Sequence, residues 1–180
     1  MSELRVYDEG DGAREQVHTR DFDTIQRELG AVGIRFERWE ASRPLAPGAS
    51  QEDILCAYQD SVARLMRERG LKSADVLRMV PDHPQREAMR GKFLDEHTHS
   101  EDEVRFFVEG RGLFSIHTHG RVFFVLCEQG DLLSVPDGTP HWFDMGPEPH
   151  FVAIRFFQQP DGWVGHFTGT DIAQRFPRYE

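Results

Sequence analysis

Hydrophobic and polar residues alternate with two different periods in the two halves of the chain. Residues 50–70 carry apolar side chains at three- and four-residue steps, the spacing of one helix face: Leu55, Tyr58, Val62, Leu65 and Met66. Ser50, followed three residues later by Asp53, fits a capping box, and Gly70 is a typical terminator. A second helix is predicted over residues 83–96. Residues 1–94 are therefore predicted to be mainly helical.

After residue 97 the pattern changes to short β-branched and aromatic runs separated by glycine and proline. These runs are VRFFVEG, GLFSIHT, RVFFVLC, DLLSVPDG, PHWFDMG and HFVAIRFFQQP, with THGR and EQGD as predicted turns. Runs of this length and spacing are typical of an all-β sandwich or barrel. We predict a mainly β fold in a single domain: an antiparallel barrel over residues 95–160, N-terminal helices packed against it, and a C-terminal segment over residues 161–180.

The composition fits a globular domain, since 38% of the 180 residues are hydrophobic and 14 are Phe. Acidic residues outnumber basic ones by 31 to 21, so the formal net charge is −10. Proteins that neutralise phosphates need a basic surface, which makes nucleic acid and anionic membranes poor candidate partners. Cys56 and Cys127 form no CxxC motif and are expected to be reduced thiols. The acidic N-terminus does not resemble a secretory signal, and no apolar run approaches the ~20 residues of a membrane span, so we expect a cytoplasmic protein. We also expect a monomer.

The segment EHTHSEDE, residues 96–103, places two histidines and a carboxylate close together. His97 and His99 are two residues apart, so on a strand both imidazoles point to the same side. Glu103 follows after a step long enough for a tight turn, and His141 lies on a later predicted strand after a Pro/Gly turn. Histidine and carboxylate are the ligands that non-haem iron uses. These four residues are the predicted metal ligands.

The other histidines lack this arrangement. His117 and His119 form a second His-x-His pair, but Phe123 stands where a carboxylate would follow, and His119 adjoins Gly120 in a predicted turn. We interpret this pair as structural or exposed. The same interpretation applies to the histidines without nearby ligand partners: His18, His83, His150 and His166.

Strand alternation predicts the walls of a pocket around the metal. If Glu103 points inward, Arg105 and Phe107 point inward too, and the residues between them face the other way. An arginine beside a metal would attract an anionic oxygen ligand through a charge-assisted contact. Phe143 falls on the inward face of a later strand by the same alternation. Arg155 interrupts an apolar strand, and it either borders the pocket or pairs with an acid at the surface.

The spacing of the predicted ligands resembles the two signature motifs of the cupin superfamily. The first motif is matched at every position by Gly91, His97, His99, Glu103 and Gly110. The second is matched by Gly130, Pro136, Gly138 and His141, whereas Met145 stands where the motif has asparagine. Two long motifs are far more specific than a lone His-x-His. Cupins nevertheless include isomerases, decarboxylases, dioxygenases, storage proteins and sensors, so the motif alone does not select a reaction.

Longer segments resemble one cupin family, the acireductone dioxygenases of methionine salvage. These segments are GIRFERWEA, HTHSEDEVRFFVEGRGLFSIH, VLCEQGDLLSVPDGTPHWFDMG, AIRFF and FTGTDIAQRFPR. The resemblance implies that one Fe(II) or Ni(II) per chain is bound by His97, His99, Glu103 and His141. It implies that O2 and the acireductone 1,2-dihydroxy-3-keto-5-methylthiopentene give formate and 2-keto-4-methylthiobutyrate with Fe(II). With Ni(II) the implied products are formate, carbon monoxide and 3-methylthiopropionate.

The same resemblance implies roles for residues around the metal. Arg105 would help to form and hold the substrate dianion, which makes it the predicted catalytic residue. Glu96 and Asp102 match positions credited with conformational relay and with metal incorporation, and either could instead be a solvated acid. Phe143 and Trp163 are placed at the methylthio end of the substrate.

Two alternative functions remain open at this point. A cupin isomerase or decarboxylase acting on a sugar or keto acid would not need oxygen as a cosubstrate, so oxygen consumption separates it from a dioxygenase. A sensor or storage domain would bind metal without turnover. However, the acidic chain shows no basic helix-turn-helix, and storage would not require an arginine beside the metal.

Overall fold

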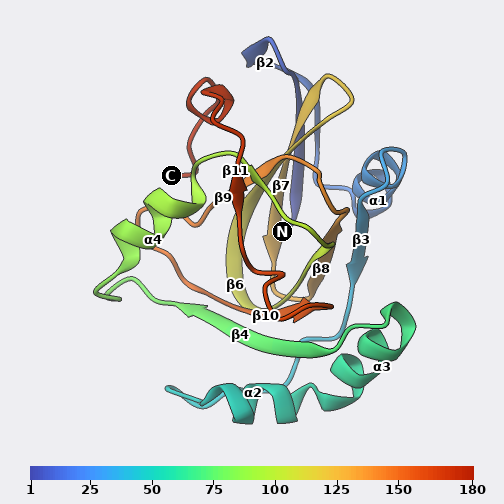
Figure 1. The fold of residues 1–180 in the computed structure, drawn as a ribbon, viewed down its shortest axis with the longest axis vertical. Helices are drawn as coiled ribbons and strands as arrows, with labels where there is room; N and C mark the ends of the chain where they lie inside the picture. The colour runs from blue at the N-terminus through green and yellow to red at the C-terminus, as the bar shows by residue number, and fades with distance from the viewer.

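Antiparallel strands form the body of the protein, and one long strand connects its two sides (Figure 1). The computed structural model describes residues 1–180. Its strands are β1 (Glu3–Asp8), β2 (Asp11–Thr19), β3 (Arg35–Arg38), β4 (Ser73–Met79), β5 (His97–Thr98), β6 (Glu103–Thr118), β7 (Arg121–Glu128), β8 (Asp131–Val135), β9 (His141–Asp144), β10 (Phe151–Phe157) and β11 (His166–Phe167). One side has the order β11-β5-β9-β6-β7-β1-β2, and the other has the order β4-β10-β6-β8-β3. The predicted mainly β architecture is therefore confirmed.

Strand β6 belongs to both sides of the barrel because it bends in its middle. Its first half pairs with β8 and β10, and its second half pairs with β7 and β9. Gly110 lies at the bend with φ +69°, and a Cβ there would lie 1.9 Å from the carbonyl oxygen of His150. Only glycine fits this backbone and this close approach. The bend brings the start of β6 and the start of β9 to the same end of the barrel interior.

The two faces of β6 pack against different parts of the core, as the alternation predicts. Phe107 belongs to the apolar cluster inside the barrel, whereas Val104 and Phe106 belong to a cluster that lies against the N-terminal helices. The strand thus separates an interior that holds the charged residues Glu103 and Arg105 from an outer core that is mainly apolar. Burial of a side chain such as Phe106, which is 0% exposed, contributes about 1.5–3 kcal/mol.

The helices lie on the outside of the barrel, as Figure 1 shows. They are α1 (Phe22–Gly30), α2 (Gln51–Ala57), α3 (Gln59–Arg69) and α4 (Arg86–Phe93), with a short 3₁₀ helix over Ile172–Gln174. The predicted helix over residues 50–70 is interrupted at Tyr58, whose backbone leaves the helical region. The capping box of Ser50 and Asp53 forms, and Gly70 ends α3 in the left-handed conformation. No helix is long and apolar enough to cross a membrane.

The N-terminal part is less helical than the sequence predicts, because residues 1–94 also contain β1, β2, β3 and β4. Strand β1 pairs along its whole length with β7, and β4 pairs along its whole length with β10. These partners lie about 70 residues or more away in the chain. The tendency of a segment to form a strand depends on packing against such cross-strand neighbours more than on local sequence. The local periodicity of residues 1–94 therefore does not predict these four strands.

Candidate metal centre

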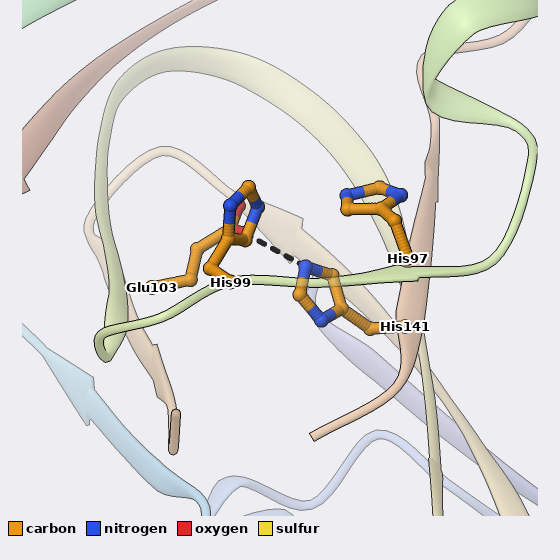
Figure 2. A group of neighbouring side chains, drawn as sticks. All are labelled: His97, His99, Glu103 and His141. Atoms are coloured by element: carbon orange, nitrogen blue, oxygen red, sulfur yellow. Dashed lines mark hydrogen bonds and ion pairs between the residues drawn. The ribbon is translucent and has the colours of Figure 1, made fainter. Parts of the chain in front are cut away.

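The structure brings the four predicted ligands to one point inside the barrel (Figure 2). His97 lies on β5, His99 follows that strand, Glu103 begins β6 and His141 begins β9. Their ligand atoms all lie within 4.8 Å of one another, and all four side chains are buried. The register explains the convergence, since His97 pairs directly with His141 on the neighbouring strand.

The three imidazoles are held by one type of contact on their outer side. Each Nδ1 lies within hydrogen-bond distance of a backbone carbonyl oxygen, so each Nδ1 donates a proton outward. The partners of His97, His99 and His141 are the carbonyls of Asp95, Val164 and Thr139, at 2.8, 2.9 and 2.8 Å. Such contacts fix the tautomer and the orientation of metal-binding histidines. All three Nε2 atoms are left facing the centre.

Glu103 divides its two oxygens between the centre and Arg105. Oε2 lies 2.8 Å from Nε2 of His99 and 2.7 Å from Nε2 of His141, while Oε1 accepts a hydrogen bond from Arg105 Nη2 at 3.0 Å. Burial raises the pKa of the Glu103 carboxyl, but Arg105 and the two histidines outweigh burial and hold this pKa well below its usual value. One carboxylate oxygen facing two imidazole nitrogens at these distances needs either protons or a metal ion between them. A divalent metal ion that takes the place of protons fits this donor set.

The histidines differ in how readily they give up a proton to such an ion. Burial, together with the charge of His141, lowers the pKa of His97 to about 4, so His97 is neutral near pH 7. Burial also acts to lower the pKa of His141, but Glu103 outweighs it and the pKa of His141 is raised. Since metal ligands must be deprotonated, the ion competes with a proton mainly at His141.

The centre opens into a cavity of about 330 Å³. The predicted pocket residues Arg105, Phe107, Phe143, Arg155 and Trp163 all line it. Sequence reasoning missed further lining residues on α4 and near the C-terminus, which no spacing rule connects to the ligands: Met89, Lys92, Phe93, Val164, Gly165 and Phe167.

Two arginines lie side by side on neighbouring strands of the cavity wall, but their partners differ. Arg105 on β6 pairs in register with Arg155 on β10. Arg155 binds Asp75 through two hydrogen bonds of 2.7 and 2.6 Å, so it both borders the cavity and pairs with an acid. Arg105 is 9% exposed and contacts one oxygen of Glu103 and the Val104 carbonyl. Arg105 is thus the guanidinium that lies nearest to the predicted ligands.

Glu96 and Asp102, on either side of the ligand segment, are both engaged in contacts. Asp102 pairs with Arg69 and accepts a hydrogen bond of 3.0 Å from the backbone of Asp137. Glu96 is only 3% exposed and contacts His117 and the C-terminal region. Burial at this level argues against the alternative that Glu96 is a solvated acid.

A segment that we call the strap, residues 158–170, crosses the ligands and was not predicted to do so. Its first end is held by Glu101, a buried carboxylate that accepts hydrogen bonds from the backbone of Gln158 and Gln159. Gly162 leaves room for this carboxylate, since a Cβ there would lie 1.9 Å from Oε1 of Glu101 and would force it to move. The sequence signals for the strap were the family resemblance of its last residues and the placement of Trp163 beside the substrate that the same resemblance implies.

The second His-x-His pair lies away from the metal centre. His117 is bound between two carboxylates, and His119 is exposed in the turn between β6 and β7, where its φ is +52°. Met145, the departure from the cupin motif, is buried in the core cluster and is not a predicted ligand.

An antiparallel barrel with three buried histidines and one glutamate at its open end defines a metal-binding protein of the cupin class. The model of the ARD/ARD′ family matches residues 3–165. A relative from Xanthomonas axonopodis pv. citri (strain 306), named acireductone dioxygenase, is 57% identical over 99% of this chain and 95% of its own length. A relative of the same name from Stenotrophomonas maltophilia (strain K279a) is 58% identical over 99% of this chain and 97% of its own.

A solved structure is similar as well. An acireductone dioxygenase from Bacillus anthracis with a cadmium ion in its active centre superimposes with a TM-score of 0.82 and is 29% identical, covering 93% of this chain and 98% of that one. The chain belongs to the ARD/ARD′ family. The predicted family, the cupin fold and the class of metal-dependent dioxygenase are therefore confirmed.

Proposed function

We propose that the protein cleaves an acireductone with O2, as an enzyme of methionine salvage, at the centre formed by His97, His99, Glu103 and His141. The observation that carries this proposal is the orientation of the donors, with three Nε2 atoms and one carboxylate oxygen turned to one point beside Arg105. A divalent metal held by these four residues would polarise an enediolate substrate as a Lewis acid.

Arg105 is the proposed catalytic residue. Its guanidinium lies in a buried wall of the cavity, where a charge-assisted contact to an oxyanion is stronger than in water. It would favour the doubly deprotonated enediolate and orient it toward O2. Arg155, already paired with Asp75, would add positive charge to the same wall.

The remaining walls fit the apolar tail of the substrate. Phe107 and Phe143 are buried aromatic residues that line the cavity, and Trp163, which is 55% exposed, lines it as well. Aromatic rings contact thioether sulfur favourably. We therefore place the methylthio end of the substrate against Phe143 and Trp163.

Glu96 and Asp102 are proposed to support the centre without binding the substrate. Asp102 ties the turn before Glu103 to α3 through Arg69, and we assign it a part in metal incorporation. Glu96 precedes His97 and contacts the strap, which suits a relay between the ligand segment and the cavity wall. We also propose a cytoplasmic monomer, because one chain supplies every donor and both cysteines are free thiols.

We further propose that one Fe(II) or one Ni(II) per chain supports two different reactions. All four donors are nitrogen or oxygen, and such a site accepts both ions, because geometry and availability rather than affinity select between them. The carbons that oxygen bridges are the ones that separate. Addition across adjacent carbons gives formate and 2-keto-4-methylthiobutyrate, whereas addition across carbons one and three also releases the middle carbon as carbon monoxide, with 3-methylthiopropionate.

One apoprotein preparation, reloaded separately with Fe(II) or Ni(II), tests the proposal with the same acireductone. Oxygen uptake, headspace carbon monoxide and a mass spectrum of the acid product are measured, with the metal-free protein as control. We expect oxygen uptake with both ions and carbon monoxide with Ni(II) only. Equal carbon monoxide from both forms would contradict the dual reaction, and turnover without oxygen uptake would favour an isomerase or decarboxylase.

A further inference from the structure

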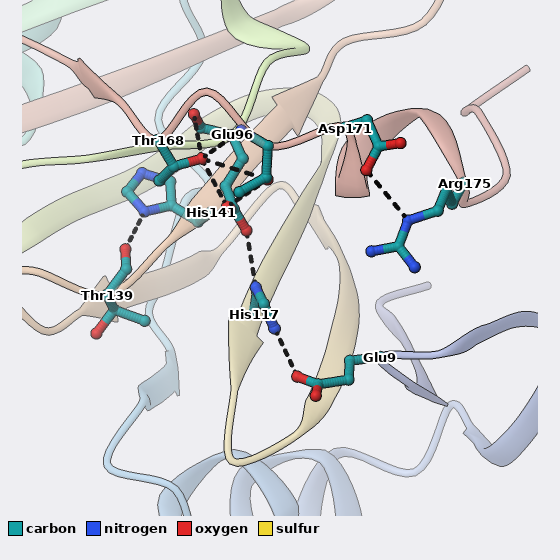
Figure 3. Close-up of polar contacts among 9 residues, drawn as sticks. Glu9, Glu96, His117, Thr139, His141, Thr168, Asp171 and Arg175 are labelled. Carbon is teal, nitrogen blue, oxygen red and sulfur yellow. Dashed lines mark hydrogen bonds and ion pairs between the residues drawn. The ribbon is translucent and has the colours of Figure 1, made fainter.

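His117, which the metal centre does not use, lies between two carboxylates (Figure 3). Its Nδ1 is 2.8 Å from Oε2 of Glu96, and its Nε2 is 2.9 Å from Oε2 of Glu9. Both ring nitrogens face acceptors, so both must carry protons and the ring is an imidazolium. Burial acts to lower the pKa of His117, but the two carboxylates outweigh it and the pKa is raised.

Glu96 divides its carboxylate between His117 and the strap, as Figure 3 shows for Thr168. Oε1 accepts hydrogen bonds from the hydroxyls of Thr168, at 2.7 Å, and Thr170, at 3.0 Å. The backbone carbonyl of Glu96 accepts a further bond of 3.0 Å from the amide of Thr168. A carboxylate that is only 3% exposed is costly without a cationic partner. His117 is the only cationic side chain that contacts Glu96, so it fixes which way the carboxylate faces.

The part of the strap that Glu96 holds is the part that covers a ligand. Strand β11 is two residues long and pairs Phe167 with His97. The Phe167 ring lies 6.0 Å from the ring of His97 and lines the cavity, yet it is 57% exposed. A short strand with an exposed aromatic ring has little apolar burial to hold it in place. Beyond its short pairing with β5, its position therefore depends on the hydrogen bonds to Glu96.

We propose that His117 is a positioning residue for the reaction: by orienting Glu96, it holds the strap against the ligand segment as a wall of the substrate cavity. Loss of this contact would loosen the wall around residues 166–170. His97 would stay held by Asp95, and His99 by Val164, which lies nearer to the end of the strap that Glu101 holds. The kinetic part of the test rests on the proposed function. Backbone hydrogen exchange of the strap tests the positioning separately from any activity.

Two substitutions separate the two contacts of His117. In His117→Asn the side-chain amide stands where Nδ1 stands and can still donate to Glu96. In His117→Gln the amide reaches toward Glu9 instead, and His117→Ala keeps neither donor. His119→Asn is the matched control, because it alters the same motif at an exposed turn where asparagine tolerates the positive φ.

In His117→Ala and His117→Gln, we expect KM for the acireductone to rise about three- to tenfold, the factor that one net hydrogen bond supports. The kcat and the metal content should stay near the wild-type values, because a wall residue contributes uniform binding. Amides of residues 166–170 should exchange faster in these two variants. His119→Asn should match the wild type in both measurements, and His117→Asn should lie between the wild type and His117→Ala, because it keeps the hydrogen bond to Glu96 but not the charge.

Unchanged exchange of residues 166–170 in His117→Ala would overturn the proposal, whatever the activity of the enzyme. A KM that rises as much in His117→Asn as in His117→Gln would also overturn it, since a general loss of stability would explain both. If His117→Ala does not fold, the Asn and Gln variants decide the question by the same criteria. If the protein proves inactive toward acireductones, the proposed function fails and the exchange comparison still decides the role of His117.

Discussion

Replacing Arg105 with alanine would remove one contact that the structure shows and one that we propose. Arg105 donates to Oε1 of Glu103 at 3.0 Å, and it lines the cavity where the substrate is proposed to bind. It is 9% exposed, so water cannot readily replace it. The substitution should therefore weaken both metal binding, through Glu103, and binding of the proposed enediolate substrate.

The size of each effect follows from the kind of contact that is lost. Removal of a partner that orients a metal ligand typically lowers metal affinity about 10- to 100-fold. Loss of one charge-assisted contact to the substrate in a buried site costs about 1.5–3 kcal/mol, which is roughly a ten- to hundredfold loss of kcat/KM. Because Arg105 also lowers the pKa of Glu103, metal binding by the variant should weaken further as the pH falls.

The assay must separate the two effects, so kcat/KM is measured at a metal concentration that saturates the variant. Raising the pH should recover part of the rate if Arg105 mainly promotes deprotonation of the substrate, and added guanidinium should do so by occupying the vacated space. Arg155→Ala is the matched control on the neighbouring strand, with a smaller expected loss because Asp75 already binds that guanidinium. Wild-type kcat/KM for Arg105→Ala at saturating metal would refute the assignment of Arg105 as the catalytic residue.

Three further predictions follow from the ligands, the strap and His117. Elemental analysis should show loss of metal when any one of the four ligands is replaced by alanine, and full metal occupancy in the control His119→Ala. Metal retained by His141→Ala would contradict the ligand set. Glu101→Ala should lower the free energy of unfolding by about 1.5–3 kcal/mol, which is a fall in Tm of roughly 3–12 °C. The control Glu148→Ala, at an exposed position, should leave Tm unchanged. Equal Tm values for the two variants would show that Glu101 does not hold the strap. Because the pKa of His117 is raised in the folded protein, its stabilising contribution is complete below its unfolded value and is lost as the pH rises through the folded value. The Tm difference between the wild type and His117→Asn should therefore narrow as the pH rises above the ordinary histidine pKa of 6.5 and through the raised pKa of the folded protein, and a constant difference would argue against a charged His117.

The sequence by itself determined the parts of the protein that depend on local spacing. His97, His99 and Glu103 lie within seven residues, so strand alternation and one tight turn are enough to bring them together. Alternation also placed Arg105 and Phe107 on the inner face of β6. The capping box at Ser50 and the glycine that ends α3 were likewise predictable, because caps are satisfied by neighbours in the chain.

Only the tertiary structure decided which distant segments complete the site. Strands β1 and β4 were missed because each is stabilised by pairing with a strand far along the chain. The strap escaped prediction for the same reason, since Glu101 binds the backbone of Gln158 and Gln159, and backbone amides leave no trace in a sequence. His117 was correctly separated from the metal ligands, but its two carboxylate partners, 21 and 108 residues away, were not foreseeable. Contacts of this range are set by how strands pair and pack, which no local pattern of residue types specifies.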